Sequence, residues 1–243
     1  MGLLIRIFIR IIGYVMASLI LISGFGFIFG RIRNIYPSVK RLFDILLAII
    51  GLIFVGPFLF LFSVIIKIYD RGPIFYRGVR VGLHGVQFRI FKFRSMVIDA
   101  ETLGGPSTSG NDSRITPIGK FLRKFKIDEL PQLFNVFLGD MSFVGPRPEV
   151  QQYVDLYTEE EKKILSVRPG ITDFASLWNS DEGAVLEKAD DPEKAYLELI
   201  RPTKLLLQMK YVNEMSMWID IKLIFNTVWA VVSRRKPEIL NEI

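Results

Sequence analysis

Two adjacent carboxylates, Asp128 and Glu129, follow a run of basic residues and form a candidate reactive pair. The basic residues immediately upstream are Arg123, Lys124 and Lys126. Pro131 fits only the first turn of a helix, so we expect a helix to begin near Asp128 or Glu129, with both carboxylates at its positive end. This placement and the nearby cations favour the ionised carboxylates. The pair suits chemistry based on carboxylates, cations and an oxygen-ligated metal, although an N-cap followed by a dipole-complementing Glu would have the same sequence.

The composition narrows the chemistry further. The 243 residues include no cysteine and a single histidine, His84, which excludes cysteine nucleophiles, thiolate metal sites and polyhistidine zinc sites. Half of the residues are hydrophobic and 23% are charged, which excludes a disordered chain, a disulfide-stapled scaffold and a polytopic transporter. Residues 31–126 carry 16 basic against 5 acidic residues, which suits either a phosphate-bearing partner or a solvated basic face. Because no zinc, helix-turn-helix or RNP motif is present, we expect no nucleic-acid partner.

The first apolar segment, residues 11–30, is uncharged and long enough to cross the hydrocarbon core of a bilayer. It lacks a small-residue cleavage site, so we interpret residues 1–36 as an uncleaved N-terminal membrane anchor. Basic residues are fewer before this segment than after it. The positive-inside rule therefore places the N-terminus outside and the rest of the chain on the cytoplasmic side.

The second apolar segment, residues 45–66, has Gly56 and Pro57 at its midpoint. Pro57 cannot donate a backbone hydrogen bond, so we expect the helix to break there. Basic residues flank both ends, and both flanks therefore favour the cytoplasmic side. We predict a re-entrant helix over residues 42–67 that enters one leaflet and returns, with a kinked transmembrane helix as the alternative. Ser63 is placed to bond to a carbonyl freed by Pro57.

The remaining residues, 68–243, are expected to form a cytoplasmic catalytic part. Residues 73–96 contain short strands around a turn at His84, which we expect to be exposed. Residues 102–113 form a polar loop that is either a lid over a site or a simple connection. Residues 205–212 and 218–232 mix large apolar residues with polar and charged ones, and the second run has helical apolar spacing, typical of either an interfacial or a core-packing helix. The predicted fold is thus mainly α with a small β-hairpin, a membrane-embedded re-entrant helix and interfacial amphipathic helices.

The motifs DELPQL and GDMSFVGPRP resemble those of the bacterial sugar transferases, the monotopic polyprenyl-phosphate phosphoglycosyl transferases. The resemblance extends over about residues 39–236. It also includes KRLFDILLA before the predicted break, GPIFYRGVRVG, FKFRSM, RITPIGKFLRK and VRPGIT after it. One such motif would be a weak signal, whereas all of them in this order are a strong one. The resemblance makes residues 37–243 the expected transferase domain.

This resemblance implies transfer of a sugar-1-phosphate from a UDP-sugar to polyprenyl (undecaprenyl) phosphate, with release of UMP. In this family the Asp of an Asp-Glu dyad forms a covalent phospho-sugar intermediate, and magnesium is the cofactor. The dyad falls on Asp128 and Glu129, which are thus the expected catalytic and metal-binding residues. The residues expected to bind substrate are Lys92, Arg94, Arg123 and Arg147.

The partners implied are the UDP-sugar, the lipid phosphate and the membrane, with a homodimer left open. The expected location is the cytoplasmic face of a bacterial inner membrane, at the first membrane step of glycoconjugate synthesis. A non-catalytic assembly component of the same pathway is the alternative function.

One region departs from the usual family sequence. The motif VRPGIT is followed here by Asp173, with Ser176 and Trp178 shortly after it, and then by an acidic stretch, residues 181–198. These residues differ in hydrogen-bonding capacity from the Gly and Gln more usual there. We therefore hypothesise that this region contributes to sugar specificity.

Overall fold

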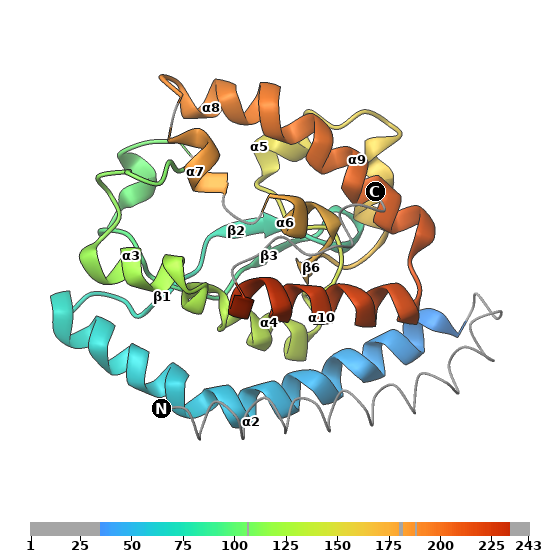
Figure 1. Ribbon diagram of the computed structural model, residues 1–243, viewed down its shortest axis with the longest axis horizontal. Helices are drawn as coiled ribbons and strands as arrows, with labels where there is room; N and C mark the ends of the chain where they lie inside the picture. Colours follow the sequence, from blue (N-terminus) through green and yellow to red (C-terminus); the bar gives the residue numbers. More distant parts are fainter. Residues whose placement is uncertain (1–34, 106, 180–181, 188, 234–243) are drawn as a thin grey trace.

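The computed structural model describes residues 35–233, except 106, 180–181 and 188 (Figure 1). The predicted anchor at residues 11–30 therefore lies outside the described residues. The α-helices are α2 (Tyr36–Asp70), α3 (Pro117–Lys124), α4 (Gln132–Leu138), α5 (Gln151–Val154), α6 (Phe174–Trp178), α7 (Glu182–Leu186), α8 (Pro192–Ala195), α9 (Arg201–Glu214) and α10 (Met217–Ser233). The strands are β1 (Phe75–Tyr76), β2 (Val79–Val81), β3 (Gln87–Arg89), β4 (Lys92–Phe93), β5 (Ser142–Val144) and β6 (Gly170–Thr172). The shorter turns are 3₁₀ at Leu83–Gly85, Ala100–Thr102, Ile127–Glu129 and Glu161–Ser166, and a π-helical turn at Tyr196–Ile200.

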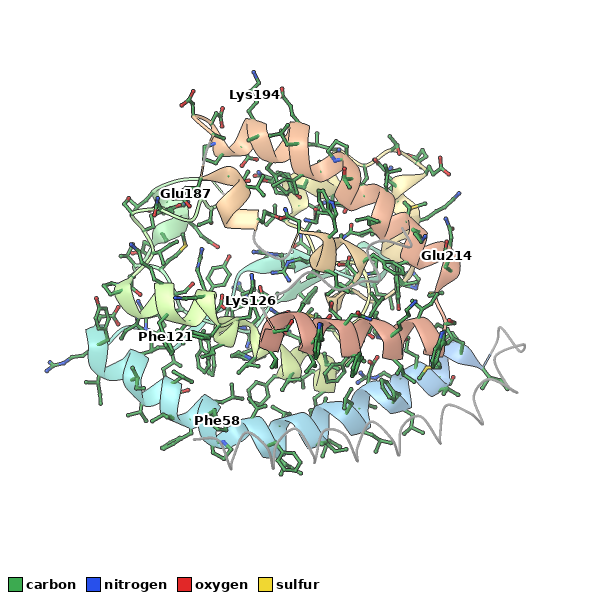
Figure 2. All side chains as sticks on the ribbon, in the orientation of Figure 1. Phe58, Phe121, Lys126, Glu187, Lys194 and Glu214 are labelled. Atoms are coloured by element: carbon green, nitrogen blue, oxygen red, sulfur yellow. The ribbon has the colours of Figure 1, made fainter. Side chains whose placement is uncertain are left out.

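Helix α2 is continuous, so the predicted break at Gly56-Pro57 is wrong at the level of secondary structure. Pro57 bends the helix instead: Figure 1 shows both ends of α2 turned toward the rest of the molecule, and Figure 2 places Phe58 at the bend. Ser63 Oγ donates to Leu59 O at 2.7 Å. That carbonyl is not the one freed by Pro57, which belongs to Ile53, four residues before it.

The apolar side chains of α2 are largely exposed. Ile53, Phe58 and Phe60 are 68%, 58% and 73% exposed. Within the part of the chain that the structure describes, α2 is also the one helix long and apolar enough to cross a membrane. Such exposure would be costly in water, so the observed α2 is compatible with association with a membrane.

Polar contacts at its N-terminal half attach α2 to the remaining helices. Lys40 Nζ lies 2.6 Å from Asp220 Oδ2 of α10, and the Tyr36 hydroxyl donates to the same oxygen at 2.9 Å. Arg41 donates to the carbonyls of Val136 and Phe137 at 2.6 and 2.9 Å. Arg41 thus satisfies carbonyls at the C-terminal end of α4, where Val136 O also accepts from Gly139 N at 3.2 Å.

The predicted β-hairpin is confirmed and consists of two short antiparallel pairs, β1 with β4 and β2 with β3. His84 lies in the connecting turn and is exposed, as expected. Phe91 and Phe93 both contact Phe75, at ring-centroid distances of 5.9 and 5.5 Å. This aromatic packing fixes the strand that carries Lys92 between them.

A parallel pair, β5 with β6, was not predicted from the sequence. Three-residue strands give too short a pattern to recognise, and their pairing brings together residues far apart in the chain. Gly145, just after β5, approaches β6 so closely that a Cβ atom would lie 2.3 Å from Arg168 O and 3.0 Å from Gly170 N. Glycine is therefore required where the chain leaves β5 toward Arg147.

Helix α10 confirms the helical spacing predicted for residues 218–232. Helices α8 and α9 run on through the π-helical turn as one rod opposite α2 (Figure 1). Leu207 and Tyr211 of α9 join Leu223 of α10 and Phe174 of α6 in a core cluster. Trp218, Phe225 and Trp229 of α10 remain more than half exposed. Helix α10 therefore has one core-packing side and one exposed apolar side.

Candidate active site

The Asp128–Glu129 pair lies on the 3₁₀ turn Ile127–Glu129, between α3 and α4, and not in the first turn of α4 as predicted. Thr116 caps α3, its side chain accepting from Gly119 N at 2.9 Å. Lys126 then adopts a left-handed conformation with φ of 56°, which redirects the chain into the turn. Pro131 occupies the N-cap of α4, and neither carboxylate caps that helix. The capping alternative for this pair is therefore wrong.

Glu129 is held by two cations from other parts of the chain. Lys92 Nζ donates to Glu129 Oε1 at 2.8 Å, from β4. Arg147 donates to both carboxylate oxygens, with Nη1 3.2 Å from Oε2 and Nη2 bonded to Oε1. Burial opposes ionisation, but the charges and hydrogen bonds of Arg147 and Lys92 hold the pKa of Glu129 well below its usual range. The expectation of an ionised carboxylate is confirmed for Glu129.

Asp128 has a different environment. Its side chain is buried, with 7% of the residue exposed, and its Oδ1 has no hydrogen-bond partner among the described residues. Burial and the negative charge of Glu129 raise the pKa of Asp128, and the opposing effect of Lys92 and Arg123 does not offset them. The expectation that its surroundings favour the ionised form is therefore wrong for Asp128. The reason is desolvation, which the sequence pattern did not reveal.

Two predicted binding residues, Arg123 and Arg94, have different surroundings. Arg123 of α3 donates from Nε to Ser95 Oγ at 2.9 Å, and its charge lowers the pKa of Asp128. Arg94 instead forms a two-point ion pair with Asp70 at the end of α2, and its Nε donates to Pro73 O at 2.6 Å. The structure thus brings Lys92, Arg123 and Arg147 to the dyad, whereas Arg94 fastens the end of α2.

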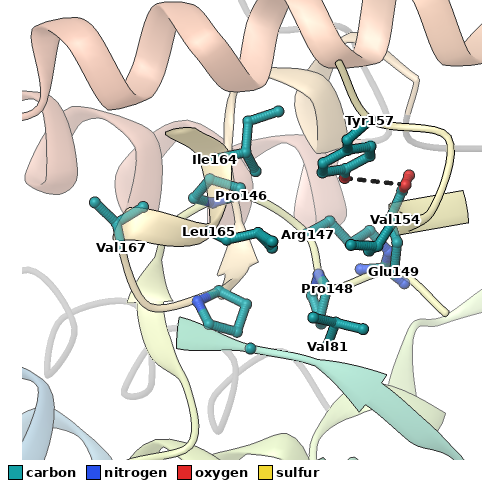
Figure 3. Close-up of a pocket in the computed structure, with 12 residues that line it drawn as sticks. Val81, Pro146, Arg147, Pro148, Glu149, Val154, Tyr157, Ile164, Leu165 and Val167 are labelled. Atoms are coloured by element: carbon teal, nitrogen blue, oxygen red, sulfur yellow. Dashed lines mark hydrogen bonds between the residues drawn. The ribbon is translucent and has the colours of Figure 1, made fainter. Parts of the chain in front are cut away.

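The segment that carries Arg147 is fixed from both sides. On one side, Pro146–Glu149 lines a small pocket together with apolar side chains, among them Val81, Ile164 and Leu165 (Figure 3). On the other side, Asp173 Oδ2 accepts from the backbone N–H of Arg147 at 3.3 Å. Asp173 also caps α6, its Oδ1 accepting from Ser176 N at 2.6 Å. The Asp that departs from the usual motif is therefore fully buried behind Arg147.

Glu149 forms a second buried polar cluster beside this segment. Its carboxylate accepts from Lys204 Nζ at 2.6 Å, the Tyr196 hydroxyl at 2.7 Å and the Tyr157 hydroxyl at 3.1 Å. Its backbone carbonyl accepts from Val81 N at 2.9 Å. The cluster therefore connects the Arg147 segment to α9 and to β2. No sequence motif indicates Lys204, which lies more than 50 residues from Glu149.

A solvent-open cleft adjoins Lys92 and Arg147, the two cations that hold Glu129, although neither Asp128 nor Glu129 is among its lining residues. Lys92, Arg147 and Gln132 line it together with Glu149 and Lys204. Its other lining residues are Arg80, Ile90, Ser107, Pro148, Val150, Tyr153, Glu182 and Tyr196. Its cations suit a ligand that carries phosphate groups.

Sequence reasoning missed Gln132, Lys204 and Glu182 as cleft residues. For Gln132 a signal existed, because it belongs to the DELPQL motif. Glu182 belongs to the acidic stretch hypothesised to affect sugar specificity. The predicted loop also reaches the cleft: Ser107 lines it, and its Oγ lies 2.8 Å from the Tyr153 hydroxyl.

Sequence comparison agrees with this arrangement. The profile of the bacterial sugar transferases matches residues 35–234, which is most of the chain. The chain belongs to the bacterial sugar transferase family. The match covers α2, the dyad, the Arg147 segment and the helices around the cleft, so the family resemblance found in the motifs is confirmed.

Curated members of this sugar transferase family include enzymes named for undecaprenyl phosphate. The UDP-N-acetylgalactosamine-undecaprenyl-phosphate N-acetylgalactosaminephosphotransferase of Aeromonas hydrophila is 36% identical over 202 residues, which are 82% of this chain and 45% of that protein. The UDP-glucose:undecaprenyl-phosphate glucose-1-phosphate transferase of Klebsiella pneumoniae is 35% identical, over 78% of this chain and 39% of that protein. The exopolysaccharide production protein ExoY of Sinorhizobium fredii is 34% identical, over 85% of this chain and 91% of that protein. The chain thus spans less than half the length of the first two.

The carboxylates of this sugar transferase fit a magnesium ion in part. Within the described ranges no group of three or more Asp, Glu or His residues could hold a metal by itself. Asp128 Oδ1 is nevertheless a buried acceptor without a partner, and magnesium commonly combines one or two carboxylates with substrate phosphates. The oxygens of Glu129 are already bonded to Lys92 and Arg147. The observed contacts therefore favour Asp128 over Glu129 as a metal ligand.

Proposed function

We propose that this protein transfers a sugar-1-phosphate from a UDP-sugar to polyprenyl phosphate, with undecaprenyl phosphate as the lipid and UMP as the released product. The observation that carries the proposal is the contrast within the dyad. Glu129 is held by Lys92 and Arg147, whereas the buried Oδ1 of Asp128 has no partner among the described residues. A carboxylate oxygen that is not engaged in the fold is available to react.

The first displacement uses Asp128 as the nucleophile. Its Oδ1 attacks the sugar-bearing phosphorus of the UDP-sugar, and the bond from that phosphorus to the bridging oxygen breaks. UMP leaves with the electron pair, and an aspartyl phospho-sugar remains. A carboxylate needs no general base for this attack, which agrees with the absence of histidine from the cleft lining.

The second displacement uses the lipid. An oxygen of polyprenyl phosphate attacks the same phosphorus, the bond to Asp128 breaks, and the carboxylate is regenerated. The products are polyprenyl-diphosphate-sugar and free enzyme. Two successive displacements let a soluble nucleotide sugar and a membrane-held lipid use one site in turn.

Fixed positive charge favours both displacements. Lys92, Arg123 and Arg147 reduce the repulsion between the carboxylate and the phosphates and favour the charge that develops on phosphoryl oxygens. When bound, magnesium would be held by Asp128 together with substrate phosphates and would supply further neutralisation of charge.

The bend of α2 supports a location at one face of a membrane. Both ends of α2 turn toward the catalytic part and carry basic residues, among them Lys40 and Lys67 (Figure 1). We propose that α2 is re-entrant, with Phe58 deepest in one leaflet and the cleft on the cytoplasmic side of the inner membrane. This arrangement would hold the dyad near the depth of the lipid phosphate.

The deciding experiment measures UMP release by the detergent-solubilised full chain with magnesium, polyprenyl phosphate and a panel of UDP-sugars. We expect release with at least one sugar, dependent on lipid for multiple turnovers, and none from Asp128→Asn. Without lipid, a sugar-labelled phosphate should remain covalently attached to the wild-type chain and not to Asp128→Asn. An active Asp128→Asn variant would refute the nucleophile, and UMP release without any lipid product would indicate a hydrolase.

A further inference from the structure

Gln132 is buried with an unsatisfied side chain beside the dyad. It is the first residue of α4, three positions after Glu129, and only 1% of it is exposed. It borders the cleft together with Lys92 and Arg147. Its Nε2 has no acceptor within the described part of the chain. A buried amide donor without an acceptor is destabilising, so its presence needs an explanation.

A second amide in α4 shows what a structural role looks like. Asn135 is fully buried, and its Oδ1 accepts from Phe91 N at 2.7 Å. Its Nδ2 donates to Arg89 O at 3.0 Å and to Asp140 Oδ2 at 3.1 Å. The same short helix thus contains one amide bonded on both sides and one whose donor is unused. Packing of α4 does not account for the polar group of Gln132.

The neighbouring carboxylate does not supply the missing acceptor. Glu129 already accepts from Lys92 and from both terminal nitrogens of Arg147. Asp128 Oδ1, the other unpartnered group of the dyad, does not accept from it either in the observed conformation. A ligand oxygen in the cleft is therefore a candidate acceptor for Gln132. Nε2 is buried in the observed conformation, and rotation about the last side-chain torsion of Gln, which is broad and soft, would turn it toward that cleft.

We propose that the side-chain amide of Gln132 donates a hydrogen bond to a non-bridging oxygen of the sugar-bearing phosphoryl group. This inference rests on the proposed transferase function and deepens it. Phosphoryl oxygens are strong acceptors, and a neutral amide donor does not compete with Lys92 and Arg147 for the carboxylates.

The choice of phosphoryl group has a kinetic consequence. The sugar-bearing phosphoryl group is present in the donor, in the aspartyl intermediate and in the second displacement, whereas the UMP phosphate leaves after the first. Gln132 should therefore assist both half-reactions. A contact to the UMP phosphate would affect the first half-reaction alone.

Two substitutions separate a donor from an acceptor at this position. Gln132→Met keeps the approximate length and removes the hydrogen bond, and Gln132→Glu keeps the shape but replaces the donor with a negative charge. Gln87 is exposed and bonded to Gln151 at 2.9 Å, away from the cleft lining, so Gln87→Met and Gln87→Glu are matched controls. The readouts are kcat/KM for UMP release, the single-turnover rates of covalent labelling and of transfer to lipid, and the Tm.

We expect Gln132→Met to lower both single-turnover rates about 10-fold or more, the value of one hydrogen bond to a charged group. Gln132→Glu should be slower still, because its charge opposes the phosphoryl oxygens. Gln132→Met should keep the wild-type Tm or exceed it, whereas the buried charge of Gln132→Glu should lower the Tm. Both Gln87 controls should retain wild-type rates.

Three results would overturn the inference. Activity of Gln132→Glu at or above that of Gln132→Met would indicate an acceptor or a metal ligand. Loss confined to the first half-reaction would assign the contact to the UMP phosphate. For Gln132→Met, rates within twofold of wild type, or a fall in Tm that parallels the loss of rate, would show that Gln132 is not a donor to the substrate. If the wild type itself releases no UMP with any sugar, the proposed function fails first, and this is visible before any variant is compared.

Discussion

Arg147 and Glu129 form a two-point ion pair at the edge of the cleft, with Arg147 Nη1 3.2 Å from Glu129 Oε2 and Nη2 bonded to Oε1. The cation expected to bind substrate phosphate is therefore also the cation that orients the dyad. The charge of Glu129 raises the pKa of Arg147 further above its usual value, so Arg147 stays protonated throughout the working pH range.

Replacement of Arg147 should separate charge from geometry. Arg147→Lys keeps the cation but loses the paired donors, and we expect kcat/KM for the UDP-sugar to fall roughly 10- to 100-fold. Arg147→Ala should lower kcat/KM for the UDP-sugar further and should change the KM for polyprenyl phosphate less. Initial rates with each substrate varied in turn measure both effects. Equal losses for the two substrates would contradict a role in handling the nucleotide sugar.

Asp128→Asn should stabilise the protein while abolishing turnover. Burial and Glu129 raise the pKa of Asp128, so at neutral pH its ionised form is unfavourable in the folded state. Removal of this charge should raise the Tm by about 2–4 °C, equivalent to about 1 kcal/mol for a domain of this size.

The pH dependence of this gain follows from the direction of the shift. A raised pKa destabilises the folded wild type above that pKa, and the difference vanishes as the pH falls and Asp128 becomes protonated in both states. Thermal unfolding of both proteins in detergent with a chelator, from pH 4 to pH 8, tests the expectation. A lower Tm for Asp128→Asn at pH 7 would show that the ionised Asp128 stabilises the fold.

The sequence motifs predicted the members of the site better than their environments. Of the six residues expected in the site, Asp128, Glu129, Lys92, Arg123 and Arg147 lie near one another, whereas Arg94 pairs with Asp70. The difference between the two carboxylates depends on Arg147 reaching Glu129 and on burial of Asp128. Both are tertiary effects that no local pattern encodes.

Two elements of the fold were likewise not predicted correctly from local sequence patterns. Pro57 predicted a break in α2, but a proline in a long apolar helix can be accommodated as a bend with the helix intact on both sides. The parallel pair β5–β6 was missed because its three-residue strands pair across more than 25 residues. By contrast, the antiparallel hairpin was predicted, because its turn and its strands are local in sequence.

The buried pair Glu149–Lys204 should confer a defined pH dependence on stability. Burial opposes ionisation of Glu149, but the Lys204 ammonium and the Tyr196 and Tyr157 hydroxyls hold its pKa below the usual range. A depressed carboxyl pKa gives stability that is present above the unfolded pKa, about 4.3, and is lost as the pH falls through the folded value. The difference in Tm between wild type and Glu149→Gln should therefore be constant from pH 6 to pH 8 and shrink below about pH 4.

Thermal unfolding of the two proteins across that range measures the effect, with Glu159→Gln as the control. Glu159 is 90% exposed beside Lys162, so its replacement should change the Tm little at any pH. A Tm difference for Glu149→Gln that grows toward acid pH would contradict the direction of the pKa shift.

The contact between Lys40 and Asp220 should determine how firmly α2 is attached. Asp220 is fully buried, and its carboxylate accepts from Lys40, Tyr36 and Tyr211, the last at 2.7 Å. Asp220→Asn should lower the free energy of unfolding by about 3–5 kcal/mol, because it leaves Lys40 largely buried without its counter-charge. Lys40→Met should cost less, since two hydroxyl donors remain on Asp220. The double variant should lower the free energy of unfolding by less than the sum of the two single variants, because each single variant leaves one charge unpaired.

Lys162→Met, at an exposed ion pair of equal length, is the control and should change the free energy of unfolding by less than about 1 kcal/mol. Denaturant unfolding in detergent gives all four values, and strict additivity of the Lys40 and Asp220 variants would mean that this pair does not couple α2 to α10.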